Sequence, residues 1–194
     1  TLTLPAITAD GNLQIRFTSP TDLTLSLTGG DLYSQLQAMG ANLNAITHLR
    51  LSGTINSQDF AVMKSVLSAL TFVDLSGCTG LTTIPANAFS QKQTLREVHL
   101  PLTTTRIQER AFEGCYSLTT VTGCDNIQEL GQSCFTGCNS LRVLPFGDKL
   151  KKFEYGVFMY CNALPENIIF PASLEENNGL VFHNCRSIKS VDFS

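Results

Sequence analysis

The stretch AFEGCYSL, residues 111–118, has near copies further along the chain. They read CFTGCNSL at 134–141, VFMYCNAL at 157–164 and VFHNCRSI at 181–188. The phenylalanine of this phrase occurs at Phe89, Phe112, Phe135, Phe158 and Phe182, in steps of 23, 23, 23 and 24 residues. A fixed period in the twenties indicates a solenoid, in which one unit cannot bury its apolar side alone and stacks on its neighbours.

Other apolar columns repeat in register with the phenylalanine. Six residues after it come Leu95, Leu118, Leu141, Leu164 and Ile188, and five before it come Ile84, Ile107, Leu130 and Phe153. Asn177 breaks the second column in the last copy. Each unit also contains a segment such as LREVHL, residues 95–100, whose last three residues alternate as a strand does. We therefore expect one strand per unit, and one long parallel sheet along one side of the stack.

The cysteine of the phrase lies three residues after the phenylalanine, at Cys115, Cys138, Cys161 and Cys185. A small, weakly polar side chain fits a tight inward corner, so we expect buried, reduced thiols. Stacked equivalents have parallel Cβ vectors, which argues against a disulfide between neighbouring units. Lys92 occupies the corner in the first copy, and we expect its turn to be looser and more exposed.

The pattern changes upstream of the phenylalanine repeats. The segment 46–53 reads as the first strand of the array, and 57–70 as a helix with Ser57 as its N-cap. Its apolar stripe is Phe60, Met63, Leu67 and Leu70. A shorter helix is expected from Asp31 to Met39, ending at Gly40. The expected fold is an α+β repeat solenoid with a helical first repeat. Residues 1–40 form a β-rich N-terminal cap with the short helix, and residues 41–194 form the array.

Composition excludes some classes of function. The chain has 194 residues and a formal net charge of −3. It therefore shows no excess of basic residues, which a nucleic-acid-binding protein would be expected to have. No apolar run approaches the ~18 residues of a membrane-spanning helix. The sequence starts at Thr1 with TLTLPAITADG, which shows no export signal.

Enzyme and metal interpretations are weaker than a binding role. His183 lies two residues from Cys185, but that cysteine belongs to the repeat column. Cys134 and Cys138 have no second pair with similar spacing, as a zinc site would need. The pair Glu175–Glu176 suits a solvated turn better than acid–base catalysis. We therefore expect no catalytic residue, no metal site and no cofactor.

The segments LSGCTGLTTIPANAF (75–89) and AFEGCYSLTTV (111–121) resemble the BspA-like leucine-rich repeats of bacterial surface proteins. The resemblance covers roughly residues 46–194. It implies a leucine-rich-repeat solenoid with units of about 23 residues. It also implies an exported protein, extracellular or at the cell surface, because members of the family are exported or lipid-anchored. Some members are implicated in adhesion to host proteins or to other bacteria. The resemblance therefore implies a non-enzymatic binding or adhesion module; a structural spacer in a larger surface protein is the alternative.

Solenoids of this kind bind across their sheet, so the outward strand positions are the candidate binding residues. They are Arg50, Asp74, Arg96, Glu97, His99, Thr120, Thr122, Arg142, Val143, Ile169, Lys189 and Asp192, and the same alternation places Pro145 and Ser190 outward. Charges, threonines and isolated apolar groups suit a protein ligand, such as a host matrix or bacterial surface protein. A glycan suits the face less well, because the chain has no tryptophan.

The last unit ends in SIKSVDFS, residues 187–194. We expect Ile188, Val191 and Phe193 to have a neighbouring unit on one side only, and the last strand to present an unpaired parallel edge. The chain is therefore expected to be a monomer or a weak dimer that associates through this edge.

Overall fold

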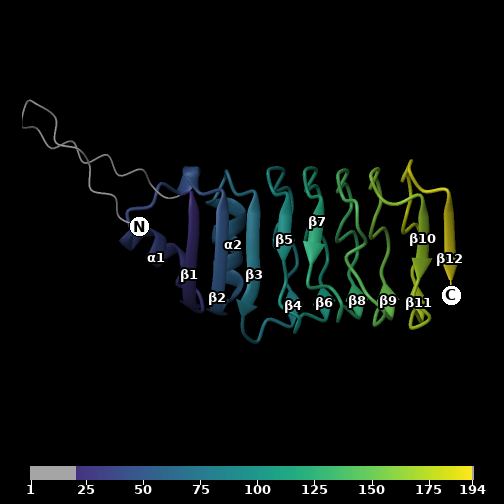
Figure 1. Ribbon diagram of the computed structural model, residues 1–194, viewed down its shortest axis with the longest axis horizontal. Coiled ribbons are helices and arrows are strands. Elements are labelled where there is room, and N and C mark those ends of the chain that lie inside the picture. Colours follow the sequence, from purple (N-terminus) through teal and green to yellow (C-terminus); the bar gives the residue numbers. More distant parts are fainter. Residues whose placement is uncertain (1–20, 194) are drawn as a thin grey trace, which may run out of the picture.

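The computed structural model describes residues 21–193, and these form a solenoid of stacked units (Figure 1). A parallel five-stranded sheet, the major sheet, runs along one side in chain order. Its strands are β1 (Asp22–Thr28), β2 (His48–Thr54), β3 (Phe72–Cys78), β5 (Glu97–His99) and β7 (Thr120–Thr122). Val73, Val98 and Val121 stand in register, so equivalent inward residues of β3, β5 and β7 lie side by side.

A second parallel sheet, the minor sheet, is a feature that the sequence did not predict. Its two-residue strands are β4 (Thr83–Ile84), β6 (Arg106–Ile107), β8 (Glu129–Leu130), β9 (Lys152–Phe153) and β11 (Glu176–Asn177). They lie along the lower edge in Figure 1. The second residue of each of the first four strands belongs to the apolar column five residues before the phenylalanine, and all four are fully buried. Asn177, which breaks that column, still pairs with Phe153 but is exposed.

The prediction of one continuous sheet is wrong at residues 141–146, which form no strand. Beyond them, β10 (Asn167–Phe170) and β12 (Ser190–Phe193) form a separate two-stranded parallel sheet. Pro145, predicted to point outward, is buried. Because proline has no N–H to donate, it cannot complete a ladder in the middle of a parallel sheet.

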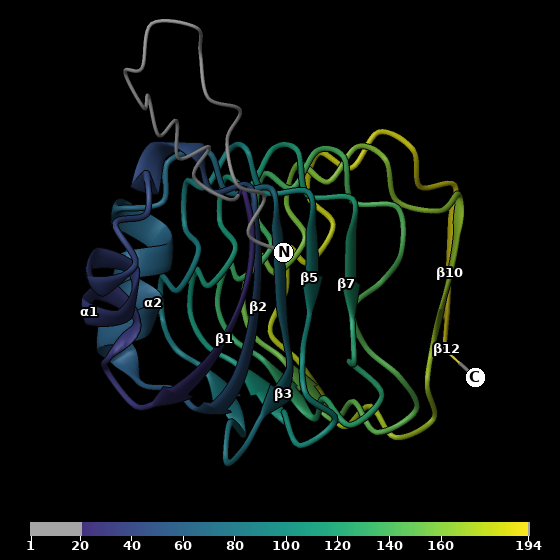
Figure 2. The ribbon, with the colours of Figure 1, turned by 60° about the vertical axis from the view of Figure 1, so that its left-hand side comes forward.

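Two helices cover the N-terminal end of the stack, α1 (Leu32–Ala38) and α2 (Ser57–Ser65), and a short 3₁₀ turn, η1 (Leu43–Ala45), follows α1. Figure 2 shows α1 and α2 side by side, next to the first strands. The predicted stripe of α2 and the residues after it is confirmed, because all four of its members are buried. The helix itself ends at Ser65, earlier than expected.

The N-cap of α2 is Asn56 rather than the predicted Ser57. The Asn56 side chain accepts from the Gln58 N–H at 2.8 Å, and the Asp59 carboxylate accepts from the Asn56 N–H at 3.0 Å. Such a reciprocal capping box satisfies amides that the helix leaves unpaired. Asp59 also accepts from Leu32 N–H at 3.0 Å, so this buried carboxylate joins the N-termini of both helices.

The N-terminal cap is described only in part. Strand β1 pairs with β2 over all seven of its residues, so it extends the major sheet by one strand. The predicted strand content of residues 1–20 lies outside the described residues. A boundary between cap and array at residues 40 and 41 stays a prediction.

The phenylalanines of the phrase form a stack through the core. The ring centroids of successive residues are 5.3, 5.1, 5.6 and 5.7 Å apart, and the ring planes lie within 16° of parallel. Phe89, Phe112, Phe135 and Phe158 are fully buried. Each ring therefore packs on the ring of the next unit, which explains why the phenylalanine recurs at a fixed period.

The cysteines have a second role beyond filling a corner. Each column thiol donates to the main-chain carbonyl of the phenylalanine in the preceding unit. The Sγ–O distances are 3.1 Å for Cys115, 3.2 Å for Cys138, 3.1 Å for Cys161 and 2.9 Å for Cys185. None of the seven cysteines is joined to another. Each of these thiols thus forms a hydrogen bond between neighbouring units.

The prediction that Lys92 gives a looser, more exposed turn is wrong, because Lys92 is 5% exposed. Its Nζ donates to the carbonyl of Lys64 at 3.1 Å and also to that of Leu67. These carbonyls lie at the end of α2, where a helix leaves acceptors unpaired. In this unit the neighbour is a helix instead of a turn, so the longer lysine replaces cysteine as the donor.

Candidate functional site

The outward side chains of the major sheet, called here the major-sheet face, form two rows across the strands. The first row is Asp22, His48, Phe72, Glu97 and Thr120, and the second is Thr24, Arg50, Asp74, His99 and Thr122. Parallel register places each residue beside its equivalent, because side chains of the same phase point to the same face. Six of the predicted site residues are thereby brought together.

Phe72 lies at the centre of the major-sheet face and is half-buried by its neighbours. The His48 ring stacks on it with a centroid distance of 5.5 Å, and the His99 ring meets it edge-on at 5.1 Å. The Arg50 guanidinium lies 5.1 Å from the ring centroid, in a cation–π contact. The centre of the major-sheet face is therefore an aromatic ring, that of Phe72, which three neighbouring side chains contact.

Charged side chains surround this aromatic centre. Arg50 forms an ion pair with Asp22, and His99 Nε2 lies 2.6 Å from Glu97 Oε1. Partial burial raises the pKa of Asp74, but hydrogen bonds from Ser76 and the charges of His99 and Arg50 outweigh it, so the pKa lies below its usual value. The positions of these side chains are thus fixed by one another before any partner binds.

The remaining predicted residues lie elsewhere. Arg96 is exposed immediately before β5, and Arg142 and Val143 lie in the segment that forms no strand. Ile169 and Asp192 are paired on the two-stranded sheet, and Lys189 precedes β12 with its Nζ 2.7 Å from Glu166 Oε2. The structure therefore divides the predicted set among the major-sheet face, the gap at 141–146 and the C-terminal sheet.

Four contributors to the major-sheet face were missed by the sequence prediction: Asp22, Thr24, His48 and Phe72. The signal was present for two of them. His48 and Phe72 each lie two residues before a predicted residue, Arg50 or Asp74, and a strand puts such residues on the same face. Asp22 and Thr24 require the pairing of β1 with β2, which the weak alternation of that segment did not indicate.

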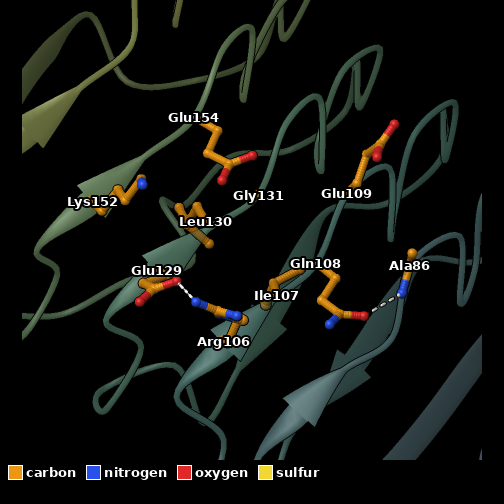
Figure 3. A pocket seen from close by; sticks show the side chains of 10 residues that line it. All are labelled: Ala86, Arg106, Ile107, Gln108, Glu109, Glu129, Leu130, Gly131, Lys152 and Glu154. Atoms are coloured by element: carbon orange, nitrogen blue, oxygen red, sulfur yellow. Dashed lines mark hydrogen bonds and ion pairs between the residues drawn. The ribbon is translucent and has the colours of Figure 1, made fainter.

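The minor sheet has an outward face of alternating charge. Arg106 forms an ion pair with Glu129, and Lys152 Nζ lies 3.2 Å from Glu176 Oε2. A pocket of about 320 Å³ opens on this face beside Gly131 (Figure 3). No sequence motif indicated it, because its lining comes from four consecutive units.

The cysteines are not arranged for nucleophilic chemistry. Burial raises the pKa of Cys115 and of Cys124 to about 12 and the pKa of Cys138 well above its usual value. Because the thiolate is the nucleophile, such thiols are unreactive at neutral pH. Cys185, beside His183 in sequence, donates to the carbonyl of Phe158.

The other candidate chemical groups have structural partners. Glu175 and Glu176 are exposed and form ion pairs with Lys151 and Lys152, but Glu176 belongs to strand β11 instead of the predicted turn. Cys134 and Cys138 are fully buried. Within residues 21–193, no three histidine, cysteine or acidic side chains gather in a way that would hold a metal ion.

Comparison with known proteins identifies the repeat. A family model described as the BspA type leucine rich repeat region matches residues 82–194 in six copies. The crystal structure of a T. pallidum leucine-rich repeat protein is similar, with 30% identity and a TM-score of 0.57. That match covers 61% of this chain and 56% of the treponemal chain, so this chain spans little more than half of that protein's length.

A leucine-rich repeat protein from Bacteroides ovatus is also similar, with 20% identity and a TM-score of 0.47 over 73% of this chain and 40% of that one. A search of curated proteins found no match. Among the described helices, none is long and apolar enough to cross a membrane.

Proposed function

Because the chain belongs to the family of BspA-type leucine-rich repeat proteins, we propose that it is a protein-binding module whose partner docks on the major-sheet face. Leucine-rich repeat arrays of bacterial proteins are interaction modules rather than enzymes. The observation that supports this face is the half-buried Phe72, flanked by His48, His99 and Arg50. Aromatic and arginine side chains that are held in place at the centre of a surface are the usual energetic anchors of protein interfaces.

The charge pattern of the face also supports a protein partner. Carboxylates at Asp22, Asp74 and Glu97 surround the aromatic centre, and Arg50 lies among them. A partner with a complementary pattern gains orientation and association rate from these charges. Such a mixed polar rim around an apolar centre is typical of protein interfaces.

We further propose that the module acts outside the bacterial cell or at its surface, in adhesion to host matrix proteins or to other bacteria. The surface location and the adhesive role are inferred from the family to which the chain belongs. A structural spacer in a larger surface protein is the competing role, and it would leave the major-sheet face without a ligand.

A binding assay separates the two roles. Immobilised extracellular-matrix proteins and bacterial surface extracts are probed with the wild-type chain and with Phe72→Ala and Arg50→Ala. Tyr155→Ala is the matched control, because Tyr155 is 45% exposed and follows strand β9 of the minor sheet rather than a strand of the major sheet. We expect both face variants to bind at least about tenfold more weakly, the effect of a typical anchor residue, and the control to bind normally. Equal binding by all four proteins contradicts the site, and no binding favours the spacer.

The C-terminal two-stranded sheet bears on association between copies of this chain. Strand β12 pairs with β10, and within residues 21–193 no strand covers its other side. Phe193 is 61% exposed on this strand. We propose weak edge-to-edge association of this chain at high concentration, which Val191→Pro abolishes because proline removes an edge N–H. Light scattering over a hundredfold concentration range tests this, and a wild-type chain that stays monomeric throughout contradicts it.

A further inference from the structure

The minor sheet carries a side-chain hydrogen bond that repeats from unit to unit. Gln108 Oε1 accepts from the Ala86 N–H of the preceding unit at 3.0 Å, and Glu154 Oε2 accepts from the Gln132 N–H at 3.1 Å. Both side chains occupy the same position, directly after the inward residue of their short strand. Each oxygen thereby satisfies a main-chain amide that the two-residue strands leave unpaired.

Gly131 occupies this position in the unit between them, so the series of hydrogen bonds is interrupted there. The amide that a side chain would satisfy is the N–H of Glu109, and no acceptor for it exists in the described part of the chain. A Cβ on Gly131 would lie 2.7 Å from the Glu109 nitrogen and 2.8 Å from the Gln108 carbonyl carbon. Close backbone approach therefore requires glycine, and the chain cannot supply the missing oxygen from this position.

The interruption coincides with the pocket of about 320 Å³. Figure 3 shows Glu154 on one side of Gly131 and Gln108 with Glu109 on the other. Among the lining charges, Arg106 is paired with Glu129, and Lys152 with Glu176. Glu154 uses one oxygen for the Gln132 amide, and within the described chain no cation lies at ion-pair distance from it. The pocket therefore offers an N–H donor at Glu109 and a carboxylate acceptor at Glu154.

We propose that this pocket binds a carboxamide, the side chain of a glutamine presented by a partner protein. The carboxamide oxygen accepts from the Glu109 N–H, and its NH₂ group donates to the Glu154 carboxylate. Glu109 and Glu154 belong to units two apart, but the Glu154 carboxylate reaches back to the Gln132 N–H in the unit between them. The Gln132 amide stands one unit, ~4.8 Å, from its equivalent at Glu109, a span that a carboxamide hydrogen-bonded at both ends can bridge. The partner's glutamine thus repeats what Gln108 does within the chain.

The charge of the pocket selects the carboxamide over a carboxylate. Glu129 is paired with Arg106 and Glu109 with Arg110, so in the described chain Glu154 is the lining carboxylate that has no cation at ion-pair distance. A ligand carboxylate would meet the Glu154 oxygens without a donor of its own, and like charges in contact are unfavourable. The site lies on the minor sheet and is independent of the major-sheet face, so either one can fail without the other.

The test is an amide NMR titration of the ¹⁵N-labelled chain. The probe is N-acetyl-glutamine N-methylamide, and the comparisons are the corresponding methionine and glutamate compounds, which carry the same main-chain amides. We expect the glutamine probe to shift the Glu109 and Gly131 signals in a saturable manner, while the methionine compound leaves them in place. A Glu109 signal that does not move, or that moves equally with all three compounds, overturns the proposal.

The substitution Glu154→Gln gives the sharper result. It keeps an oxygen for the Gln132 N–H but replaces the free acceptor by an NH₂ donor. The preference of the pocket for the glutamine probe should therefore reverse, so that the variant binds the glutamate probe about tenfold more tightly than the glutamine probe. Glu175→Gln, which removes the same charge outside the pocket, should keep the original preference. A Glu154→Gln variant that still prefers glutamine contradicts the assigned acceptor. N-acetylglucosamine binding more tightly than the glutamine probe would show an acetamido sugar site and contradict the protein partner.

Discussion

The phenylalanine of the repeated phrase is the residue on which each unit depends. Phe135 is fully buried and stacks against Phe112 at 5.1 Å and Phe158 at 5.6 Å. Phe135→Ala should lower the free energy of unfolding by about 3–5 kcal/mol, the range for a buried phenylalanine that leaves a cavity. Urea denaturation measures the change. Val143→Ala is the control, because Val143 is 55% exposed, and it should lie within about 0.5 kcal/mol of wild type. A Phe135→Ala chain as stable as the control would contradict the stack.

The buried thiols make the fold sensitive to alkali. Burial raises the pKa of Cys78 to about 11 and that of Cys115 and Cys124 to about 12. Unfolded thiols ionise near pH 8.5, so above that value the unfolded chain binds fewer protons than the folded chain. The stability that these thiols contribute is fully present below that pH and is lost as the pH rises toward their folded pKa. Urea midpoints should fall from pH 8.5 to 10.5, and a flat profile would show that the thiols are not buried.

The contribution of Lys92 to stability depends on pH in the opposite direction to that of the thiols. Burial lowers the pKa of its ammonium to about 8, below the usual 10.5. Between these two values the unfolded chain binds more protons, so the Lys92 contribution to stability rises with pH. Lys92→Met removes this rise, and its urea midpoint should fall more steeply between pH 8 and 10.5 than that of the wild type. Parallel profiles of the two proteins would contradict a buried Lys92 ammonium.

At the scale of elements, the structure differs most from a regular array between β7 and β10. Residues 141–146 form no strand, and Pro145 lacks the N–H that a ladder requires. The amides of residues 143, 144 and 146 should therefore exchange with deuterium faster than their equivalents at 120, 121 and 123, of which the first two lie in β7. Hydrogen-exchange mass spectrometry resolves the two segments. Equal protection would show that the major sheet continues through the gap.

The sequence predicted the elements whose signal repeats. Phe112, Cys138 and Val121 recur in columns, and such columns fix both the inward faces and the register of the major sheet. The minor sheet escaped prediction because its strands have two residues, too few to show alternation. Lys92 was misjudged because its acceptors lie 25 and 28 residues upstream, at and just after the end of α2, which the local pattern does not connect to it.

The candidate sites were predictable to different degrees. Alternation alone places Arg50, Asp74 and His99 on one face, and the structure does bring them together around Phe72. The pocket on the minor sheet could not be foreseen. Gln108 and Glu154 each accept a hydrogen bond from a main-chain amide of the preceding unit, and Gly131, at the equivalent position between them, has no side chain to do so. Predicting the pocket would have required knowing which amides these side chains contact.

At the scale of the whole molecule, the chain is a row of units in which each unit contacts its neighbours. The stability of such a solenoid is approximately a sum over units and the interfaces between them. The phenylalanine stack and the thiol–carbonyl bonds both cross these interfaces. Energetic coupling should therefore be strong between adjacent units and absent between distant ones.

A double-mutant cycle tests this claim most directly. Phe112→Leu and Phe135→Leu, which keep an apolar side chain in each position, are made singly and together, and urea denaturation gives the four free energies of unfolding. Stacked neighbours should couple by about 0.5–1.5 kcal/mol. The same cycle on Phe89 and Phe158, three units apart, should give additive effects within about 0.5 kcal/mol. Additive effects for the adjacent pair, or coupling as large for the distant pair, would contradict a stack of units in register.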